Sequence, residues 1–131
     1  MEMKISFPEG QKVNASFNGF VVKTDQSVEN GGKGDAPDPF SLFLSSIGTC
    51  TGIYVLRFCQ KRNIPKESVT IVLKTQTNDS TGFVEKISVI IHTTDQFPLK
   101  YKAALLKTAS LCTVKKHLES PPSVELSFSD E

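Results

Sequence analysis

Hydrophobic and polar residues alternate in short runs along most of the chain, and one long apolar segment interrupts them near the middle. This segment is residues 38–62, and between its acidic first residue and its basic end the only charged residue is Arg57. Asp38 followed by Pro39 is typical of a helix start, and the asparagine and proline within residues 63–65 indicate its end. Because apolar side chains fall on every side of this helix, we expect it to be buried inside the structure.

The shorter runs on either side of the helix predict β-strands, because they alternate or are rich in β-branched residues. They are residues 3–7, 11–17, 20–24, 68–77 and 82–93. Asn18-Gly19 is a strong signal for a tight hairpin between the second and third strands. The loop at residues 78–82 predicts another hairpin, and the imperfect alternation of the strand after it indicates a bulge or an edge change.

Residues 98–118 predict a second helix, and the two prolines that follow it end it. Its two adjoining apolar stripes are Leu99, Ala103, Leu106 and Ser110, and Leu105, Ala109 and Cys112. Residues 123–128 predict a last strand. The element order is therefore βββ-α-ββ-α-β, an α+β fold in which helices pack on antiparallel strands, within a single domain of residues 1–131.

The length and charge of the chain argue against a nucleic-acid-binding protein and a membrane protein. The chain has 131 residues, 15 basic and 14 acidic side chains, and a net charge of +1. No basic stripe is interleaved with aromatic residues, so a nucleic-acid partner is not expected. Arg57 and several polar residues within the apolar helix, and the lack of a signal-peptide pattern at Met1, argue against a membrane role. A chain this short covers an all-apolar helix poorly, which favours a homodimer.

Three cysteines without a CxxC pair are not a secreted disulfide framework and fit a cytoplasmic protein with one or two functional thiols. Cys50 lies among small residues that leave room for a substrate. Cys59 is nine residues further along the same helix, a rise of about 13 Å that is beyond disulfide reach. Cys112 can approach Cys50 only through tertiary packing. Buried thiols are more often simple packing residues than reactive ones, so both interpretations stay open.

Other candidate sites have weaker patterns. The GGKG of the loop at residues 25–37 lacks the spacing and the following Ser or Thr of a phosphate-binding loop. His92 and His117 could join Cys50 and Cys112 in a zinc site, but no close ligand pair is present. His117 could also pair with a cysteine for acyl transfer. We expect no metal and no cofactor.

The sequence DPFSLFLSSIGTC, together with a second cysteine in LLKTASLCTVKKHL and a final predicted strand, resembles the OsmC/Ohr family of thiol-dependent hydroperoxide reductases. The resemblance covers nearly the whole chain in element order. It implies an intertwined homodimer with sites at the subunit interface. It also implies that the Cys50 thiolate attacks a peroxide, giving an alcohol and a sulfenic acid, and that Cys112 resolves this acid to a disulfide that an external thiol or dithiol reduces.

The chain departs from the family pattern at two positions. Phe40 stands where well-characterised members have a glutamate. Its only arginines, Arg57 and Arg62, both follow Cys50, whereas the family pairs the thiolate with an arginine in the N-terminal half. A thiolate needs a positive neighbour or a helix start to form readily. Arg57 two turns on could support it, and the N-terminal half offers the lysines Lys12, Lys23 and Lys33.

These observations favour a peroxidase with catalytic residues Cys50 and Cys112, active on organic hydroperoxides in an apolar site. The predicted substrate-binding residues are Phe40, Phe43, Ile47 and Tyr54. The alternative is a binding protein of the same fold, which keeps an apolar interface pocket with little or no peroxidase turnover.

Overall fold

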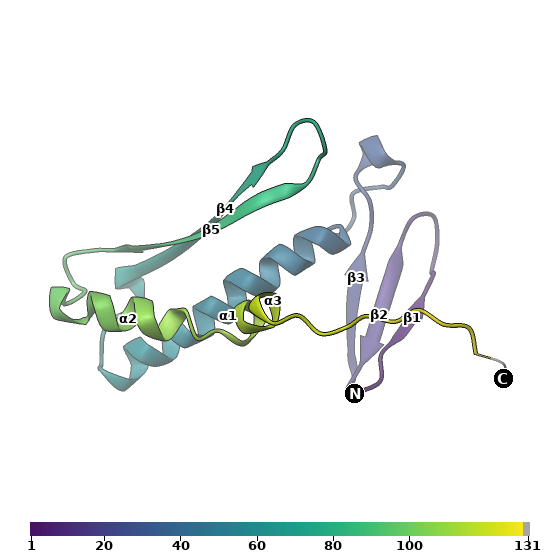
Figure 1. Cartoon of the computed structure of the whole chain (residues 1–131). Helices are drawn as coiled ribbons and strands as arrows, with labels where there is room; N and C mark the ends of the chain where they lie inside the picture. The colour runs from purple at the N-terminus through teal and green to yellow at the C-terminus, as the bar shows by residue number, and fades with distance from the viewer. Residues whose placement is uncertain (130–131) are drawn as a thin grey trace. The chain divides into compact units, whose positions relative to one another are not determined.

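The computed structural model describes residues 1–129 and, within them, has three α-helices and two antiparallel sheets (Figure 1). The elements are β1 (Lys4–Ser6), β2 (Val13–Phe17), β3 (Phe20–Thr24), α1 (Pro39–Lys61), β4 (Val69–Thr77), β5 (Val84–Thr93), α2 (Lys102–Ala109) and α3 (Thr113–Glu119), with short 3-10 turns at Val28–Asn30, Lys66–Ser68 and Leu99–Tyr101. The predicted α+β fold is confirmed. The chain divides into two compact units, Met1–Ser45 and the residues from Ser46 onward.

The N-terminal unit contains an antiparallel sheet in the order β1-β2-β3. Asn18 and Gly19 have φ values of 47° and 79°, the left-handed backbone that a two-residue hairpin turn of this kind requires. The turn pairs Phe17 with Phe20, whose ring centroids lie 6.1 Å apart. The predicted hairpin is therefore confirmed.

The loop that follows β3 is organised around a buried carboxylate. Asp25 is 1% exposed and accepts backbone N–H groups from Gln26 at 2.8 Å, Lys33 at 3.3 Å and Asp35 at 3.1 Å. Burial by itself raises the pKa of Asp25, but these three donors and the nearby Lys12 charge outweigh it and lower that pKa. Lys12 also pairs with Asp35 at 2.8 Å. The loop is thus tied to the sheet by hydrogen bonds and one ion pair.

Gly32 makes this loop possible because a side chain does not fit there. A Cβ atom at Gly32 would lie 2.0 Å from the Gln26 carbonyl oxygen. The loop closes where the Asp25 N–H donates to the Pro37 carbonyl at 3.2 Å. At the start of α1, the Asp38 carboxylate accepts the Ser41 hydroxyl, and the helix begins at Pro39 as predicted.

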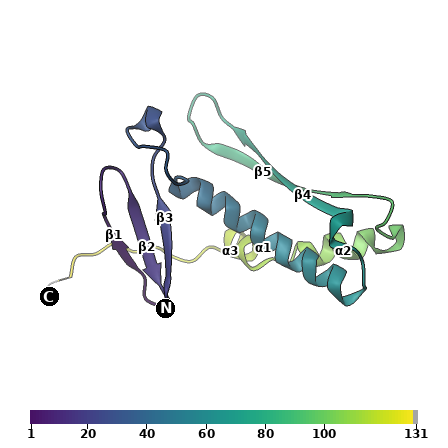
Figure 2. The ribbon, with the colours of Figure 1, turned by 180° about the vertical axis from the view of Figure 1, so that it is seen from behind.

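In the C-terminal unit, α1 packs along one side only. The β4–β5 hairpin and α2 both lie alongside this helix (Figures 1 and 2). The buried residues of α1 recur at intervals of four, three and one along the helix, as expected for one face. They are Ile47, Thr51, Val55, Phe58 and Cys59.

The prediction that α1 is buried on every side is therefore wrong for the single chain. Ile53, for example, is 38% exposed. The physical reason is that one hairpin and one short helix supply too little surface to cover the whole helix. By length and composition, α1 is also the one helix within residues 1–129 that could cross a membrane, a property that core helices of globular proteins share.

The hairpin of β4 and β5 runs in antiparallel register from Val69 opposite Thr93 to Thr77 opposite Val84, with an irregularity between Gln76 and Thr77. The expected bulge is thus confirmed. The hairpin packs Val69, Ile71 and Ile91 against the core of this unit. The core residues are Val55, Phe58, Cys59, Ile64, Phe97, Leu105 and Ala109.

The second long helix is a correction to the sequence prediction, because residues 98–118 form two helices and not one. The helices α2 and α3 are separated by Ser110, Leu111 and Cys112. Cys112 has an extended backbone (φ −54°, ψ 134°), and the Ser110 hydroxyl donates to the Lys107 carbonyl at 2.7 Å. Serine and threonine compete for backbone hydrogen bonds in this way, which weakens a helix at such a point.

Of the two predicted apolar stripes, one is buried and the other is not. Leu105, Ala109 and Cys112 are all 5% exposed or less. In contrast, Leu99 and Leu106 are 79% and 65% exposed. The exposed stripe leaves an apolar surface without cover in the single chain.

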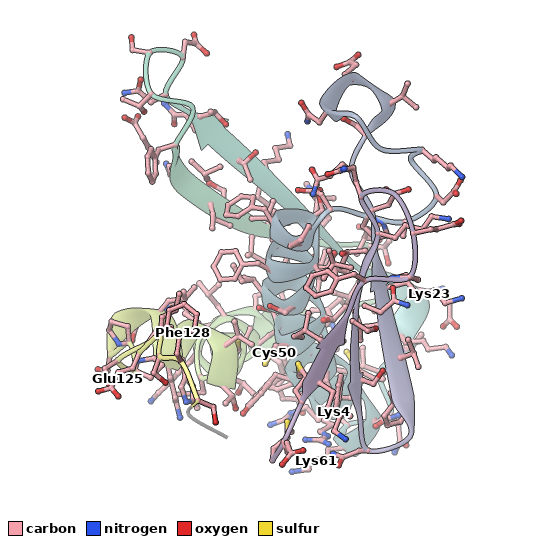
Figure 3. All side chains as sticks on the ribbon, turned by 90° about the vertical axis from the view of Figure 1, so that its right-hand side faces the viewer. Lys4, Lys23, Cys50, Lys61, Glu125 and Phe128 are labelled. Carbon is pink, nitrogen blue, oxygen red and sulfur yellow. The ribbon has the colours of Figure 1, made fainter. Side chains whose placement is uncertain are left out.

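The predicted last strand at residues 123–128 is also wrong for the single chain. This segment carries no regular secondary structure, and Val124, Leu126 and Phe128 are 82%, 93% and 101% exposed. Figure 3 labels Phe128 on it. The alternation typical of a strand is present, but within residues 1–129 no strand pairs with this segment, and a strand is stable only when its backbone groups are paired.

Acid should open the loop at residues 25–37. Since the pKa of Asp25 is lowered by folding, its carboxylate stabilises the fold fully above the unfolded value of about 3.9, and this stabilisation is lost as the pH falls through the folded value. Amide hydrogen exchange at Lys33 and Asp35, followed against pH, measures this. Asp25→Asn should remove their protection even at neutral pH, whereas Glu29→Gln in the same loop should not. Unchanged protection in Asp25→Asn would contradict the role given to the carboxylate.

Candidate functional site

The structure brings together two of the three cysteines. Cys50 lies on α1 and is half-buried, whereas Cys112 lies just before α3 and is 0% exposed. Figure 3 labels Cys50 on its helix. The side chains of Cys50 and Thr51 lie close enough to the Cys112 sulfur to lower the pKa of its thiol. Both cysteines are free thiols.

The interruption between α2 and α3 makes this contact possible. The chain turns at Ser110 and Leu111, and Cys112 then becomes the residue that caps α3. The Lys115 N–H donates to Cys112 Sγ at 3.4 Å, and the Val114 N–H is a further donor to it. In a continuous helix these N–H groups would be bonded to carbonyl oxygens one turn earlier, so the break releases them to the sulfur.

Hydrogen bonding to the sulfur decides the acidity of Cys112. Burial raises the pKa of the Cys112 thiol, but the Lys115 N–H, the Cys50 and Thr51 side chains and the Val114 N–H together outweigh burial and lower that pKa. The two backbone N–H groups are neutral donors that stabilise the thiolate. The Cys112 thiol is therefore more acidic than an ordinary cysteine thiol.

Cys59 is separate from this pair. It is 1% exposed on α1, and burial raises the pKa of its thiol, an effect that the Arg62 charge opposes in part. The Arg62 guanidinium lies 3.6 Å from the centre of the Phe58 ring and donates to the Phe58 carbonyl at 3.3 Å. These contacts give Arg62 a structural role at the end of the helix.

An apolar cavity of about 410 Å³ is lined by Thr51, the residue that follows Cys50 in the sequence. Thr51 connects this cavity to the cysteines, because it lines the cavity and its side chain lowers the pKa of the Cys112 thiol. The ion pair of Lys115 and Glu119, at 2.7 Å, is the charged part of the lining. The lining residues are Ile47, Thr51, Ile87, Val89, Ile91, Leu106, Ala109, Ser110, Lys115, Leu118 and Glu119.

Ile47 and Tyr54, two of the predicted substrate-binding residues, line different cavities. Ile47 lines the apolar cavity. The Tyr54 hydroxyl lies 3.4 Å from Thr113 Oγ1, and Tyr54 lines a different cavity of about 340 Å³ together with Arg57. Arg57 is itself exposed.

Phe40 and Phe43 belong to the N-terminal unit. They contact each other with ring centroids 5.5 Å apart and are 47% and 36% exposed. Both therefore present apolar surface to solvent in the single chain. The prediction that they bind substrate stays a prediction.

Sequence reasoning missed Thr51 and the cavity wall from β5. The alternation of Ile87, Val89 and Ile91 is the signal that could have identified the wall, because side chains two apart on a strand share one face. Thr51 gave only a weak signal as one of several small residues beside Cys50. For the proposed zinc site, no group of three or more His, Cys, Asp or Glu side chains gathers within residues 1–129, and His117 Nδ1 lies 2.7 Å from the Thr113 carbonyl oxygen.

Comparison with solved structures finds the same fold in several proteins. An osmotic stress induced and detoxification response protein from Psychrobacter arcticus is 21% identical, with a TM-score of 0.71 over 87% of this chain and 85% of that one. A hypothetical protein from Aquifex aeolicus is 18% identical, with a TM-score of 0.66 over 92% and 87% of the two chains. The organic hydroperoxide resistance protein OsmC from Legionella pneumophila is 20% identical, with a TM-score of 0.56 over 89% and 87%.

A comparison with curated proteins finds no match. The model of the OsmC-like protein family, however, matches residues 32–127, which include α1, the β4–β5 hairpin and both cysteines of the pair. The match spans most of the chain. The protein therefore belongs to the OsmC-like family.

Proposed function

We propose that this protein is a thiol-dependent peroxidase that reduces organic hydroperoxides. The observation that most supports this is the proximity of the Cys50 and Cys112 side chains, together with Thr51, which lies close to Cys112 and lines an apolar cavity. Family membership suggests a redox or peroxide-resistance role in general, and the Legionella neighbour is an organic hydroperoxide resistance protein. The chemistry below is the finer part of the proposal.

In this proposal Cys50 reacts first, because it is the accessible member of the pair. Its sulfur attacks the terminal peroxide oxygen, so that an S–O bond forms, the O–O bond breaks and the alcohol leaves. Cys112 then attacks the Cys50 sulfenic acid and forms a disulfide. An external thiol or dithiol reduces this disulfide, which suits the reducing cytoplasm.

The cavity supports an organic peroxide as the substrate. Its wall is formed mainly by aliphatic side chains of α1, β5 and α2, including Ile47, Val89 and Leu106. Burying an alkyl group there is favourable by roughly 25 cal/mol per Å². Hydrogen peroxide has no apolar surface and gains nothing from this wall.

The same cavity also favours the alternative function, a binding protein for an apolar ligand with little turnover. Its volume of about 410 Å³ suits a small molecule. Phe40 stands in place of the glutamate of well-characterised members, and both arginines follow Cys50. A ligand that binds equally well to wild type and Cys50→Ser without being consumed would favour this alternative.

We also propose that the protein works as a homodimer. The single chain leaves exposed one side of α1, the stripe with Leu106 and the apolar residues of the tail, including Leu126 and Phe128. A second copy offers complementary apolar surface, and the tail needs a strand to pair with.

Hydroperoxide consumption should depend on Cys50. Wild type supplied with a dithiol should consume an organic hydroperoxide faster than hydrogen peroxide, and Cys50→Ser should fall to the uncatalysed rate because it lacks the nucleophile. Cys59→Ser is the matched control on the same helix and should stay active. Equal rates of wild type and Cys50→Ser would reject the proposed function.

One equivalent of organic hydroperoxide should produce an intrachain Cys50–Cys112 disulfide and leave Cys59 reduced. The reason is that only Cys50 contacts Cys112, whereas Cys59 is buried elsewhere on the helix. Peptide mapping by mass spectrometry measures the linkage. A stable Cys50 sulfenic acid beside reduced Cys112 would rule out the resolving role, and a linkage through Cys59 would contradict the packing described here.

Light scattering at micromolar concentration should give the mass of a dimer. Replacing Leu126 and Phe128 together by serine should weaken the dimer, because both lose apolar surface that the second copy would bury. Glu125→Gln, a polar position in the same tail, should leave the mass unchanged. A stable wild-type monomer would contradict the proposed assembly.

A further inference from the structure

We propose that the cavity at the end of α1 binds the carboxylate groups of the small thiol that reduces this protein. The reductant role rests on the proposed function, whereas the anion-binding site does not. The cavity has a volume of about 340 Å³ and lies in the unit that contains both cysteines of the pair. Its lining residues are Tyr54, Arg57, Phe58, Lys61, Arg62 and Thr108.

The positive charge of this cavity is not neutralised by the protein. Half of the lining residues are cations, and the lining includes no acidic side chain. The helices α1 and α2, which supply most of the lining, contain no aspartate or glutamate. Within residues 1–129 the ion pairs are those of Lys12 and Lys115. Arg57 and Lys61, both exposed, therefore have no acidic partner in the described part of the chain.

The helix dipole accounts for only part of this charge. Lys61 lies in the last turn of α1, where a cation is favourable beside the free carbonyl groups. Arg57 lies one turn earlier, beyond the reach of that effect, and two cations four residues apart on a helix repel each other. Arg62 is held over the Phe58 ring at 3.6 Å. A bound anion replaces the repulsion between Arg57 and Lys61 with attraction, so these charges suit an anionic ligand.

The lining groups fit carboxylates on a small molecule. The planar guanidinium of Arg57 matches a carboxylate with two parallel hydrogen bonds, and Lys61 supplies a second point charge. The hydroxyl groups of Tyr54 and Thr108 add hydrogen-bonding capacity, and the volume is that of a small-molecule site. The apolar cavity offers no such charge, because its one lysine already pairs with a glutamate. A hydrophilic acidic ligand is therefore expected in the cavity at the end of α1.

The position of this cavity on α1 connects it to Cys50. Tyr54, Arg57 and Lys61 follow Cys50 by four, seven and eleven residues. With 3.6 residues per turn, these positions share one face of the helix. Figure 3 labels Cys50 and Lys61 on this helix. Arg57 is about 10 Å from Cys50 along the helix axis, a length that a small extended thiol spans. A thiol held by its carboxylates at Arg57 and Lys61 therefore has its sulfur within reach of Cys50.

The bound thiol reduces the proposed Cys50–Cys112 disulfide in two steps. Its thiolate attacks the Cys50 sulfur, the more accessible of the two, so that a mixed disulfide forms, the bond to Cys112 breaks and Cys112 takes the electron pair. A second thiol molecule attacks the reductant sulfur of the mixed disulfide and releases the Cys50 thiolate. The two thiol molecules lose two electrons and become one disulfide, and their two protons pass to Cys50 and Cys112.

The first test is binding of S-methylglutathione, which has two carboxylates and no free thiol, to the reduced wild-type protein without peroxide. NMR should show a saturable shift of the Arg57 side-chain N–H signal, and the diethyl ester of the same compound should cause none. In Arg57→Gln/Lys61→Gln, binding measured by calorimetry should weaken by roughly 10-fold, because two exposed ion pairs are lost. Lys102→Gln/Lys107→Gln removes the same charge from α2 outside the cavity and should bind as wild type does.

Two results of this binding test would overturn the anion-binding site. One is the absence of saturable binding to wild type, and the other is equal binding to both double variants. If a carboxylate of a second copy fills the cavity, S-methylglutathione will not bind, and Arg57→Gln/Lys61→Gln will lower the mass of the dimer. That outcome also rejects the site for a small molecule.

The second test measures thiol attack at Cys50 without peroxidase turnover. Cys50 of a Cys59→Ser/Cys112→Ser protein is converted to its methyl disulfide, and mass spectrometry follows the loss of the methylthio group in glutathione. Adding Arg57→Gln/Lys61→Gln should slow this reaction by roughly 10-fold at low salt, and the difference should shrink as the ionic strength rises. Glutathione diethyl ester should react equally with both proteins.

Equal rates with glutathione would overturn the reductant role, and with it the proposal. The wild-type protein offers the same comparison if the serine variants do not fold, because its cysteines can be converted to methyl disulfides and released one by one in the peptide map. A protein that consumes no peroxide but keeps the charge-dependent rate at Cys50 would reject the proposed function and still support this site.

Discussion

The packing of one side of α1 against α2 and the β4–β5 hairpin is the constraint from which the site follows. Val55 and Phe58 hold α1 against Leu105 and Ala109. With α2 fixed in this way, the turn after Ala109 delivers the next buried residue, Cys112, to the level of Cys50 on the facing helix. The thiol contact thus depends on apolar burial more than on any polar interaction, because burial sets where the two helices meet.

Local patterns predicted those elements whose signals are complete within a few residues. The turn at Asn18 and Gly19 requires a left-handed backbone that few other pairs adopt easily, so the first hairpin was evident from the sequence. The ends of α1 were also evident, because Asp38 and Pro39 mark its start and the asparagine and proline within residues 63–65 mark its end. The association of Cys50 with Cys112 was not evident from the sequence. Cysteine spacing did not distinguish reactive thiols from buried packing residues, and only the resemblance to a family indicated the pair.

The errors came from interactions that are not local. The apolar repeat of residues 98–118 continues through the break between α2 and α3, so periodicity alone predicts one helix. The helix is interrupted because the Ser110 hydroxyl bonds to a backbone carbonyl and Cys112 caps the start of α3. The alternation in residues 123–128 indicates which side chains would share a face of a strand. It does not indicate which strand would pair with this segment. The hydropathy of α1 shows that its apolar side chains must be buried. It does not show that a single chain buries them on one side of the helix only.

The burial of Cys59 has a consequence for the fidelity of thiol exchange. In the proposed reaction, a third thiol could compete with Cys112 for the Cys50 sulfenic acid, and the external reductant could react with it instead of with the disulfide. Cys59 lies in the core, covered at the helix end by Arg62 over the Phe58 ring, and burial raises the pKa of its thiol. Cys59 therefore forms little thiolate, and its sulfur is not accessible to other reactants. Burial thus gives Cys59 a packing role and keeps it apart from the proposed redox pair, Cys50 and Cys112.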